Sequence, residues 1–246
     1  MKNIKCLICD SPDEQFLFEK NGYKLVRCCK CGLAYINPQP LLSELNDYYQ
    51  GTYGELYVSS PRKIKSKFRD ARRELRRLQK LSKISRPNIL DVGCSFGYLV
   101  KTAQDAGWEA TGVDPSHHAV DSAKNNFKIN VLGGDIFHPD LKKKHYDFIT
   151  MFDVIEHHLN PLESLQRAHE LLKTEGFLIL GVPDFGHYKA VKSRESWDNF
   201  IPPEHLFYFN LETIKKICHR AGFEFHKKIL RSPFRDSLKT VYRKKR

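Results

Sequence analysis

The stretch from Asn88 to Val100 constrains the fold most, because it reads as a strand, a tight turn and the start of a helix. A short apolar run ends at Asp91, and Gly93 and Gly97 follow it. Glycine tolerates positive φ and lets a backbone approach a ligand closely. In an α/β sheet, a turn of this kind after a buried parallel strand is where a nucleotide-like ligand is held. The turn therefore predicts a ligand-binding α/β sheet, to which the upstream chain is attached.

Strand and helix patterns alternate regularly downstream of this turn. Such alternation specifies an α/β fold with a doubly wound, mostly parallel sheet. We expect a Rossmann-like sheet with helices at 97–106, 115–127, 161–173 and 211–221, and with seven strands at 88–91, 108–114, 129–132, 146–152, 177–182, 223–229 and 238–242.

Length and hydropathy limit the class of protein. A chain of 246 residues can bury one α/β core and a small appendage. No run approaches the roughly 18 apolar residues of a membrane span, and the first residues lack the apolar core of a signal peptide. We therefore expect a cytoplasmic protein without a transmembrane segment.

The net charge of +12 is unevenly distributed. Residues 60–86 carry a net +10 and residues 226–246 a net +8, which leaves −6 for the remainder. The two basic segments are interpreted either as solvated surface or as attraction to an anionic partner. Nucleic acid, an anionic glycan, a nucleotide-linked substrate and an acidic membrane surface all qualify.

Five of the seven cysteines lie in the first 31 residues. The pairs Cys6-x-x-Cys9 and Cys28-x-x-Cys31 have the spacing of a tetrahedral four-cysteine zinc site. Cys29 is a competing ligand for the position of Cys28, and an iron–sulfur centre or a redox pair is the alternative chemistry. Four thiolates would leave zinc no open position for catalysis, so we expect a structural Zn²⁺.

Three segments follow from these patterns. Residues 1–40 are expected to form a zinc-ribbon-like module, residues 41–86 a linker and a basic amphipathic helix, and residues 87–246 the ligand-binding domain. The helical pattern begins at Pro61 and is basic on its outer face. Tyrosines in the linker are interpreted as packing residues rather than as a recognition motif: Tyr48, Tyr49, Tyr53 and Tyr57.

Acidic residues stand at the ends of three successive predicted strands, namely Asp91, Asp114 and Asp135. Because the carboxyl ends of parallel strands meet at one edge of a sheet, these side chains should surround the crevice where ligands bind. Asp114 lies 21 residues after Gly93, a separation at which an acid accepts hydrogen bonds from the ribose hydroxyls of a nucleoside.

The motifs resemble those of class I S-adenosylmethionine (SAM) methyltransferases. Asp91 to Gly97 is similar to the D-x-G-x-G-x-G turn of that family, with Ser95 in place of the middle glycine. Ser95 and Tyr98 also disfavour a nicotinamide enzyme, whose G-x-G-x-x-G turn needs glycine there. The resemblance spans about residues 83–225 through the segments 89–100, 110–116, 134–137, 148–160 and 171–183.

Two parts of the chain resemble narrower groups. Residues 151–161 are similar to the branch that includes ubiquinone-pathway O-methyltransferases. The four-cysteine ribbon joined through Asn-Pro-x-Pro resembles a bacterial subgroup associated with cell-surface sugar and other small-molecule pathways.

The resemblance implies SAM as the cofactor and assigns residues to each part of it. It implies that Gly93 and Gly97 contact the methionine end, that Asp91 orients the amino group, and that Asp114 binds the ribose hydroxyls. Asp135, beside Ile136, would accept from the adenine amino group, and Phe152 and Asp153 would line the sulfonium side.

Candidates for acid–base chemistry follow the fourth predicted strand. Histidine titrates near neutrality and can take a hydroxyl proton, and His157 is the preferred base, with Glu156 orienting it. His205 is a second candidate, from the opposite wall. The alternative is that these histidines only brace loops. A further alternative is a catalytic divalent cation held by Asp153, Glu156, His157 and His205.

The leading hypothesis is a methyltransferase that acts on a small molecule, such as a sugar or cell-surface polysaccharide precursor, at a hydroxyl. An RNA methyltransferase that uses the ribbon and the basic helix to hold its substrate is one alternative. A catalytically inactive SAM- or anion-binding module is another, although the intact Asp114 and Asp135 argue against it. The identity of the acceptor, the methylated atom and the oligomeric state stay open.

Overall fold

The computed structural model describes residues 1–45, 61–230 and 232–245, and its central element is a seven-stranded sheet. The strand order is β10-β11-β8-β7-β4-β5-β6. Strands β8, β7, β4, β5 and β6 pair in parallel, whereas β11 is antiparallel to β8 and β10. The prediction of a mostly parallel α/β sheet is confirmed. The strands are β4 (Asn88–Val92), β5 (Glu109–Asp114), β6 (Val131–Gly133), β7 (Tyr146–Phe152), β8 (Leu172–Pro183), β10 (Phe223–Ile229) and β11 (Ser237–Lys244).

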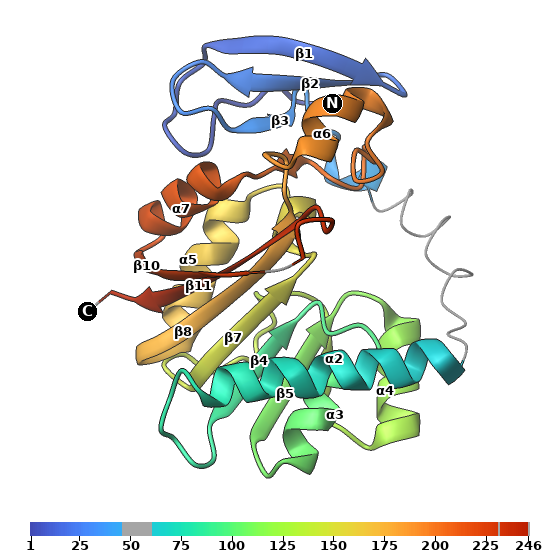
Figure 1. The fold of residues 1–246 in the computed structure, drawn as a ribbon, viewed down its shortest axis with the longest axis vertical. Coiled ribbons are helices and arrows are strands. Elements are labelled where there is room, and N and C mark those ends of the chain that lie inside the picture. The colour runs from blue at the N-terminus through green and yellow to red at the C-terminus, as the bar shows by residue number, and fades with distance from the viewer. Residues whose placement is uncertain (46–60, 231, 246) are drawn as a thin grey trace.

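Helices cover both faces of this sheet (Figure 1). On one face lie α2 (Pro61–Gln79), α3 (Tyr98–Asp105) and α4 (His117–Phe127), and on the other α5 (Pro161–Leu171) and α7 (Leu211–Arg220). Capping side chains fix where α4, α5 and α7 begin. Ser116, Asn160 and Asn210 each accept a hydrogen bond from an N–H of the first helical turn.

One boundary differs from the prediction. The sequence predicts a helix at 161–173 and a strand that begins at Phe177, but α5 ends at Leu171 and β8 begins at Leu172. Leu172 pairs with Tyr146 of β7, so the ladder with the neighbouring strand extends β8 beyond what its apolar run indicates.

The N-terminal segment forms a second sheet together with a strand from the far end of the chain. It contains a hairpin of β1 (Glu14–Lys20) and β2 (Tyr23–Cys28), followed by β3 (Ala34–Ile36). The fourth strand is β9 (Phe207–Tyr208), which pairs with β3 and was not foreseen. The segment 1–40 therefore completes its sheet with residues of the domain that follows.

This second sheet also shares its apolar contacts with the rest of the molecule. On one side Leu25 and Ile36 pack with Trp197 and Phe200, which follow the short helix α6 (Tyr188–Ser193). On the other side Tyr35 belongs to the same core as β7, β8, α5 and α7. The N-terminal segment thus lies above one end of the central sheet and packs against it (Figure 1). The separate status of residues 1–40 stays a prediction.

Two further expectations concern the linker and the membrane. The four linker tyrosines lie outside the described residues. Among the residues that are described, no helix is long and apolar enough to cross a membrane.

Candidate functional site

The turn between β4 and α3 has the tight backbone that its glycines suggested. Gly93 and Gly97 adopt φ values of 69° and 72°. A Cβ on Gly93 would lie 2.3 Å from Val154 Cγ2, and one on Gly97 would lie 2.3 Å from Ile129 Cδ1. A side chain at either position would therefore be strained by the positive φ, and Val154 or Ile129 would have to move.

Ser95 takes the left-handed conformation that a glycine would adopt more readily. Its φ is 48°, and its backbone N–H donates to Asp114 Oδ2 at 2.7 Å. A hydrogen bond to a carboxylate is stronger than one between neutral groups, and it offsets part of the strain. The departure from the glycine pattern is accommodated without moving the turn.

The three strand-end acids lie at one edge of the sheet in different environments. Asp91 is 6% exposed and accepts a hydrogen bond from Thr150 Oγ1 at 2.6 Å. Burial, and to a smaller degree the charge of Asp114, raises the pKa of Asp91 to about 7. Burial also raises the pKa of Asp114, which accepts from the N–H of Ser116. Asp135 is exposed and accepts from the N–H of Phe137, and its neighbour Ile136 is buried.

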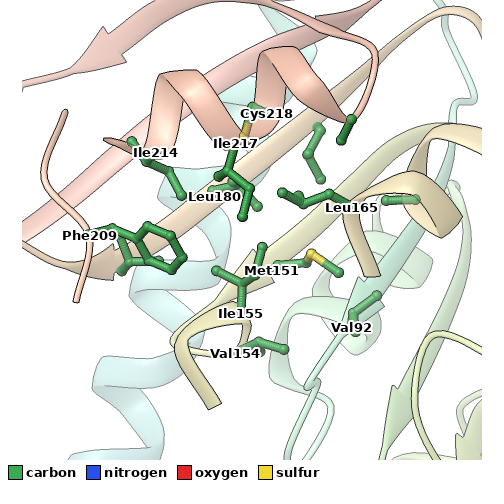
Figure 2. Packing of buried hydrophobic residues seen from close by; sticks show 14 of the residues in the cluster. Val92, Met151, Val154, Ile155, Leu165, Leu180, Phe209, Ile214, Ile217 and Cys218 are labelled. Atoms are coloured by element: carbon green, nitrogen blue, oxygen red, sulfur yellow. The ribbon is translucent and has the colours of Figure 1, made fainter. Parts of the chain in front are cut away.

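After β7 the chain forms a short 3-10 helix, Ile155–His157, which places acid and base side chains near the same edge. Figure 2 shows Val154 and Ile155 in the apolar cluster with Met151 and Phe209. Because this turn is anchored in the core, the position of the following Glu156 is set by packing. Asp153, at φ 55°, is exposed at the rim, and Phe152 is partly buried.

Glu156, His157 and His205 converge in space. One ligand atom from each lies within 4.8 Å of the others, and the two imidazole rings are 4.6 Å apart in a T-shaped arrangement. His157 Nδ1 donates to the carbonyl oxygen of Glu204 at 2.9 Å, and His205 Nδ1 donates to that of Asn199 at 2.8 Å. Carbonyl acceptors fix the tautomer, so both Nε2 atoms carry lone pairs.

Burial shifts the ionisation of this group. Burial and, secondly, the neighbouring His205 lower the pKa of His157 to about 3. Burial likewise lowers the pKa of His205 to about 4. Burial and the charge of Asp153 raise the pKa of Glu156 well above its usual range, and neither carboxylate oxygen has a hydrogen-bond partner among the described residues. The histidines are neutral at physiological pH, and Glu156 has unused ligand capacity.

His158 points to a different neighbour. Its Nδ1 is 2.6 Å from Ser164 Oγ in α5, so it braces the start of that helix. Sequence reasoning missed the carbonyl groups of Asn199 and Glu204. Both lie in the irregular segment after α6, and no local pattern indicates which carbonyl will face a histidine.

The four predicted zinc ligands also converge. The sulfur atoms of Cys6, Cys9, Cys28 and Cys31 all lie within 4.8 Å of one another, and Cys29 is exposed outside the group. Burial raises the pKa of Cys6, whereas backbone hydrogen bonds from Cys31 and Lys30 overcome burial and lower that of Cys28 to about 7. Four thiols at such short separations fit a tetrahedral metal site.

Comparisons with known proteins show the family to which the chain belongs. A family model described as a methyltransferase domain matches residues 64–228. A ubiquinone biosynthesis O-methyltransferase from Hydrogenovibrio crunogenus is 23% identical over 233 residues, covering 81% of this chain and 90% of that protein. A protein of the same name from Rickettsia bellii is 29% identical over 142 residues, which is 53% of each chain.

Solved structures show the same fold. Magnesium protoporphyrin IX methyltransferase from Synechocystis, with bound S-adenosylhomocysteine (SAH), superposes with a TM-score of 0.59 at 19% identity, over 82% of this chain and 95% of that one. A SAM-dependent methyltransferase from Thermotoga maritima, described as a possible histamine N-methyltransferase, gives 0.57 at 19% identity, over 82% and 96%. The chain therefore belongs to the methyltransferase-domain family. It is a SAM-dependent methyltransferase with a Rossmann-like fold.

The cysteine geometry generates a direct metal prediction. We expect the purified chain to carry one zinc, and Cys28→Ser to lose it because a tetrahedral site needs all four thiolates. The matched control is Cys29→Ser, which should retain the metal because Cys29 lies outside the group. Elemental analysis of the native protein, Cys28→Ser and Cys29→Ser measures the zinc content of each. Iron in place of zinc, or equal zinc in both variants, would contradict the assignment.

Proposed function

We propose that the protein transfers a methyl group from SAM to a hydroxyl of a small-molecule acceptor. The observation that carries the proposal is that Glu156, His157 and His205 converge just after the carboxyl end of β7, the edge of the sheet at which Asp91 is next to last in β4 and Asp114 is last in β5. O-methyltransferases among the relatives, with the Hydrogenovibrio protein matched over 90% of its length, support a hydroxyl acceptor.

Each part of the cofactor has a proposed receptor. Gly93 and Gly97 admit the methionine end, and Asp91 orients its amino group. Asp114 binds the ribose hydroxyls, supported by its position as the last residue of β5. At the adenine end, Asp135 accepts from the amino group beside Ile136. Phe152 and Asp153 line the side of the sulfonium.

The reaction requires in-line alignment more than activation. The bond between the methyl carbon and sulfur breaks as a bond to the acceptor oxygen forms. The bonding pair stays on sulfur, which becomes the thioether of SAH, and the hydroxyl proton is released to solvent. Because SAM is already an activated donor, holding the acceptor oxygen in line with the methyl group supplies most of the acceleration.

A hydroxyl becomes a better nucleophile when a base removes its proton or when a bound cation lowers its pKa. An imidazole with a pKa of about 3 is a weak base, because general bases work best with a pKa near the working pH. The same neutral imidazole is a good metal ligand, and metal-bound histidines usually donate their other N–H to a carbonyl or carboxylate, as both do here. We therefore assign His157 and His205 to a metal site rather than to free-base chemistry.

The residues fit a divalent cation. One ligand atom each from Glu156, His157 and His205 lies within 4.8 Å of the other two, and neither carboxylate oxygen of Glu156 has a hydrogen-bond partner among the described residues. Asp153, the fourth predicted ligand, does not belong to this group of converging residues. When bound, such an ion lowers the pKa of a coordinated hydroxyl. The protein's own contribution is to hold the imidazole tautomers through Asn199 and Glu204 and to exclude water by burial.

An anionic group on the acceptor is supported by two surfaces. The exposed face of α2 is rich in lysine and arginine. A cavity of about 170 Å³ beneath the N-terminal sheet is lined by Phe18, Phe185, Arg27 and Arg194 among others. Phe185 packs on Tyr208, whose hydroxyl donates to the carbonyl of His205. The aromatic and arginine lining of the cavity supports a nucleotide-linked sugar or a polysaccharide precursor as the acceptor.

The basic face of α2 also supports RNA as a second candidate acceptor. Binding to a polyanion would weaken steeply with salt, because phosphate contacts release counterions. A gel-shift titration with transfer RNA at low and high salt separates the two acceptor classes.

Asp114→Ala should weaken SAM and SAH binding by about tenfold or more, because it removes a charge-assisted contact to the ribose. Asp114→Asn removes the charge but keeps an oxygen that can accept from the Ser95 N–H. Comparing it with Asp114→Ala shows how much of the lost affinity comes from disturbing the turn. Asp121→Ala, an exposed acid of α4, is the matched control. Calorimetry measures all three. Unchanged affinity in Asp114→Ala, or tighter binding of NAD than of SAM by the native protein, would contradict the cofactor assignment.

Glu156→Gln should abolish tight Mn²⁺ binding at the active site, because a neutral amide replaces the anionic ligand. Glu163→Gln, a nearby exposed acid, should bind Mn²⁺ as the native protein does. Free and bound Mn²⁺ are counted by electron paramagnetic resonance with zinc left in the N-terminal site. Equal Mn²⁺ affinity in native protein and Glu156→Gln would contradict the metal site. In that case the turnover of His157→Ala, compared with that of the native protein, would test whether His157 acts without a metal.

A further inference from the structure

A buried ion pair connects the basic helix to the last strand. Lys239 of β11 and Glu74 of α2 are 7% and 4% exposed, and Lys239 Nζ is 2.8 Å from Glu74 Oε2. Burying two charges costs much of what their attraction returns, so such a pair is weak evidence for stability alone. Its position in the sheet is more informative.

The pair lies at the ligand edge. Strand register places Lys239 opposite Gly181 and Gly181 opposite Phe152. Lys239 Nζ stands 3.7 Å from the centre of the Phe152 ring. Phe152 is the residue proposed to line the sulfonium side, so the ammonium group of Lys239 is one aromatic ring away from the proposed cofactor site.

The hydrogen bonds of the pair are unevenly distributed. Glu74 Oε2 accepts from both Lys239 and Arg77, the latter at 3.0 Å. The other oxygen, Oε1, is buried and has no partner among the described residues. A buried carboxylate oxygen without a hydrogen-bond donor calls for an explanation. A bound ligand whose N–H group donates to this oxygen would explain it.

Asp91 belongs to the same group of charges. Its side chain bonds to Thr150, two residues before Phe152 on the same face of β7. The charges of Lys239 and Glu74 both influence the pKa of Asp91, in opposite directions. One cation and two carboxyl groups therefore share this end of the site.

We infer that Glu74 and Lys239 bind the zwitterionic amino-acid end of the cofactor. Lys239 pairs with the α-carboxylate, and Glu74 Oε1, together with Asp91, accepts from the α-ammonium group. Opposite charges on the protein match opposite charges on the ligand, and charge-assisted hydrogen bonds of this kind are the strong ones. The inference rests on the proposed placement of the methionine end beside Asp91 and Phe152.

Two thioether ligands test this directly by calorimetry. SAH carries the amino-acid end, and 5′-methylthioadenosine has the same nucleoside and sulfur without it. Lys239→Met should raise the Kd for SAH about tenfold or more and leave the Kd for methylthioadenosine within about twofold. Glu74→Gln should behave in the same way. Lys228→Met, an exposed lysine of the neighbouring strand β10, is the matched control.

Comparing the two ligands separates a binding role of the Glu74–Lys239 pair from a purely structural role. Equal losses for SAH and methylthioadenosine would show that the pair only holds α2 in place, and no loss for either would exclude any role in binding. If Lys239→Met does not fold by circular dichroism, Glu74→Gln, which preserves size and removes the charge, gives the same comparison. Failure of the native protein to bind SAH would contradict the cofactor site itself, whereas native binding with an unselective variant would contradict only this inference.

Discussion

Leu206 connects the N-terminal sheet to the candidate site through its backbone. Its carbonyl oxygen accepts from the N–H of Ile36 in β3, and its own N–H donates to the carbonyl of Glu156, both at 2.9 Å. His205 is the preceding residue, and β9 begins at the following one. The positions of Glu156 and His205 relative to each other therefore depend on a strand pairing that the four-cysteine segment helps to build. The N-terminal sheet is part of the site's scaffold.

Burial then sets the chemistry of the groups that this scaffold brings together. Water is largely excluded from Glu156 and His205, which are 1% and 5% exposed. Desolvation disfavours charged imidazole and charged carboxylate alike, so the resting group is close to neutral. Neutral imidazoles with fixed tautomers and a carboxyl group without partners favour a cation. A free imidazole base would need a more exposed position.

The sequence predicts what local pattern determines. Apolar runs and glycine turns locate all seven strands of the main sheet, and Cys-x-x-Cys spacing selects the four converging thiols. Contacts between distant segments carry no such signal. The pairing of β3 with β9, the carbonyl partners of His157 and His205, and the Glu74–Lys239 pair each join residues whose own neighbourhoods give no indication of the other. Ser95 shows the reverse case, in which a nonlocal acceptor, Asp114, makes an unfavourable residue acceptable.

The central claim is that the cysteine site and the Glu156 site are mechanically connected. The most direct measurement is the Mn²⁺ affinity of Cys9→Ser against that of Cys29→Ser, by electron paramagnetic resonance. Because Cys9 belongs to the four-thiol group and Cys29 does not, only Cys9→Ser should loosen β3 and, through Leu206, Glu156 and His205. We predict an increase in Kd of about tenfold or more for Cys9→Ser, corresponding to about 1.4 kcal/mol, with Cys29→Ser unchanged. Equal Mn²⁺ affinities in the two variants, with Cys9→Ser devoid of zinc, would contradict the account.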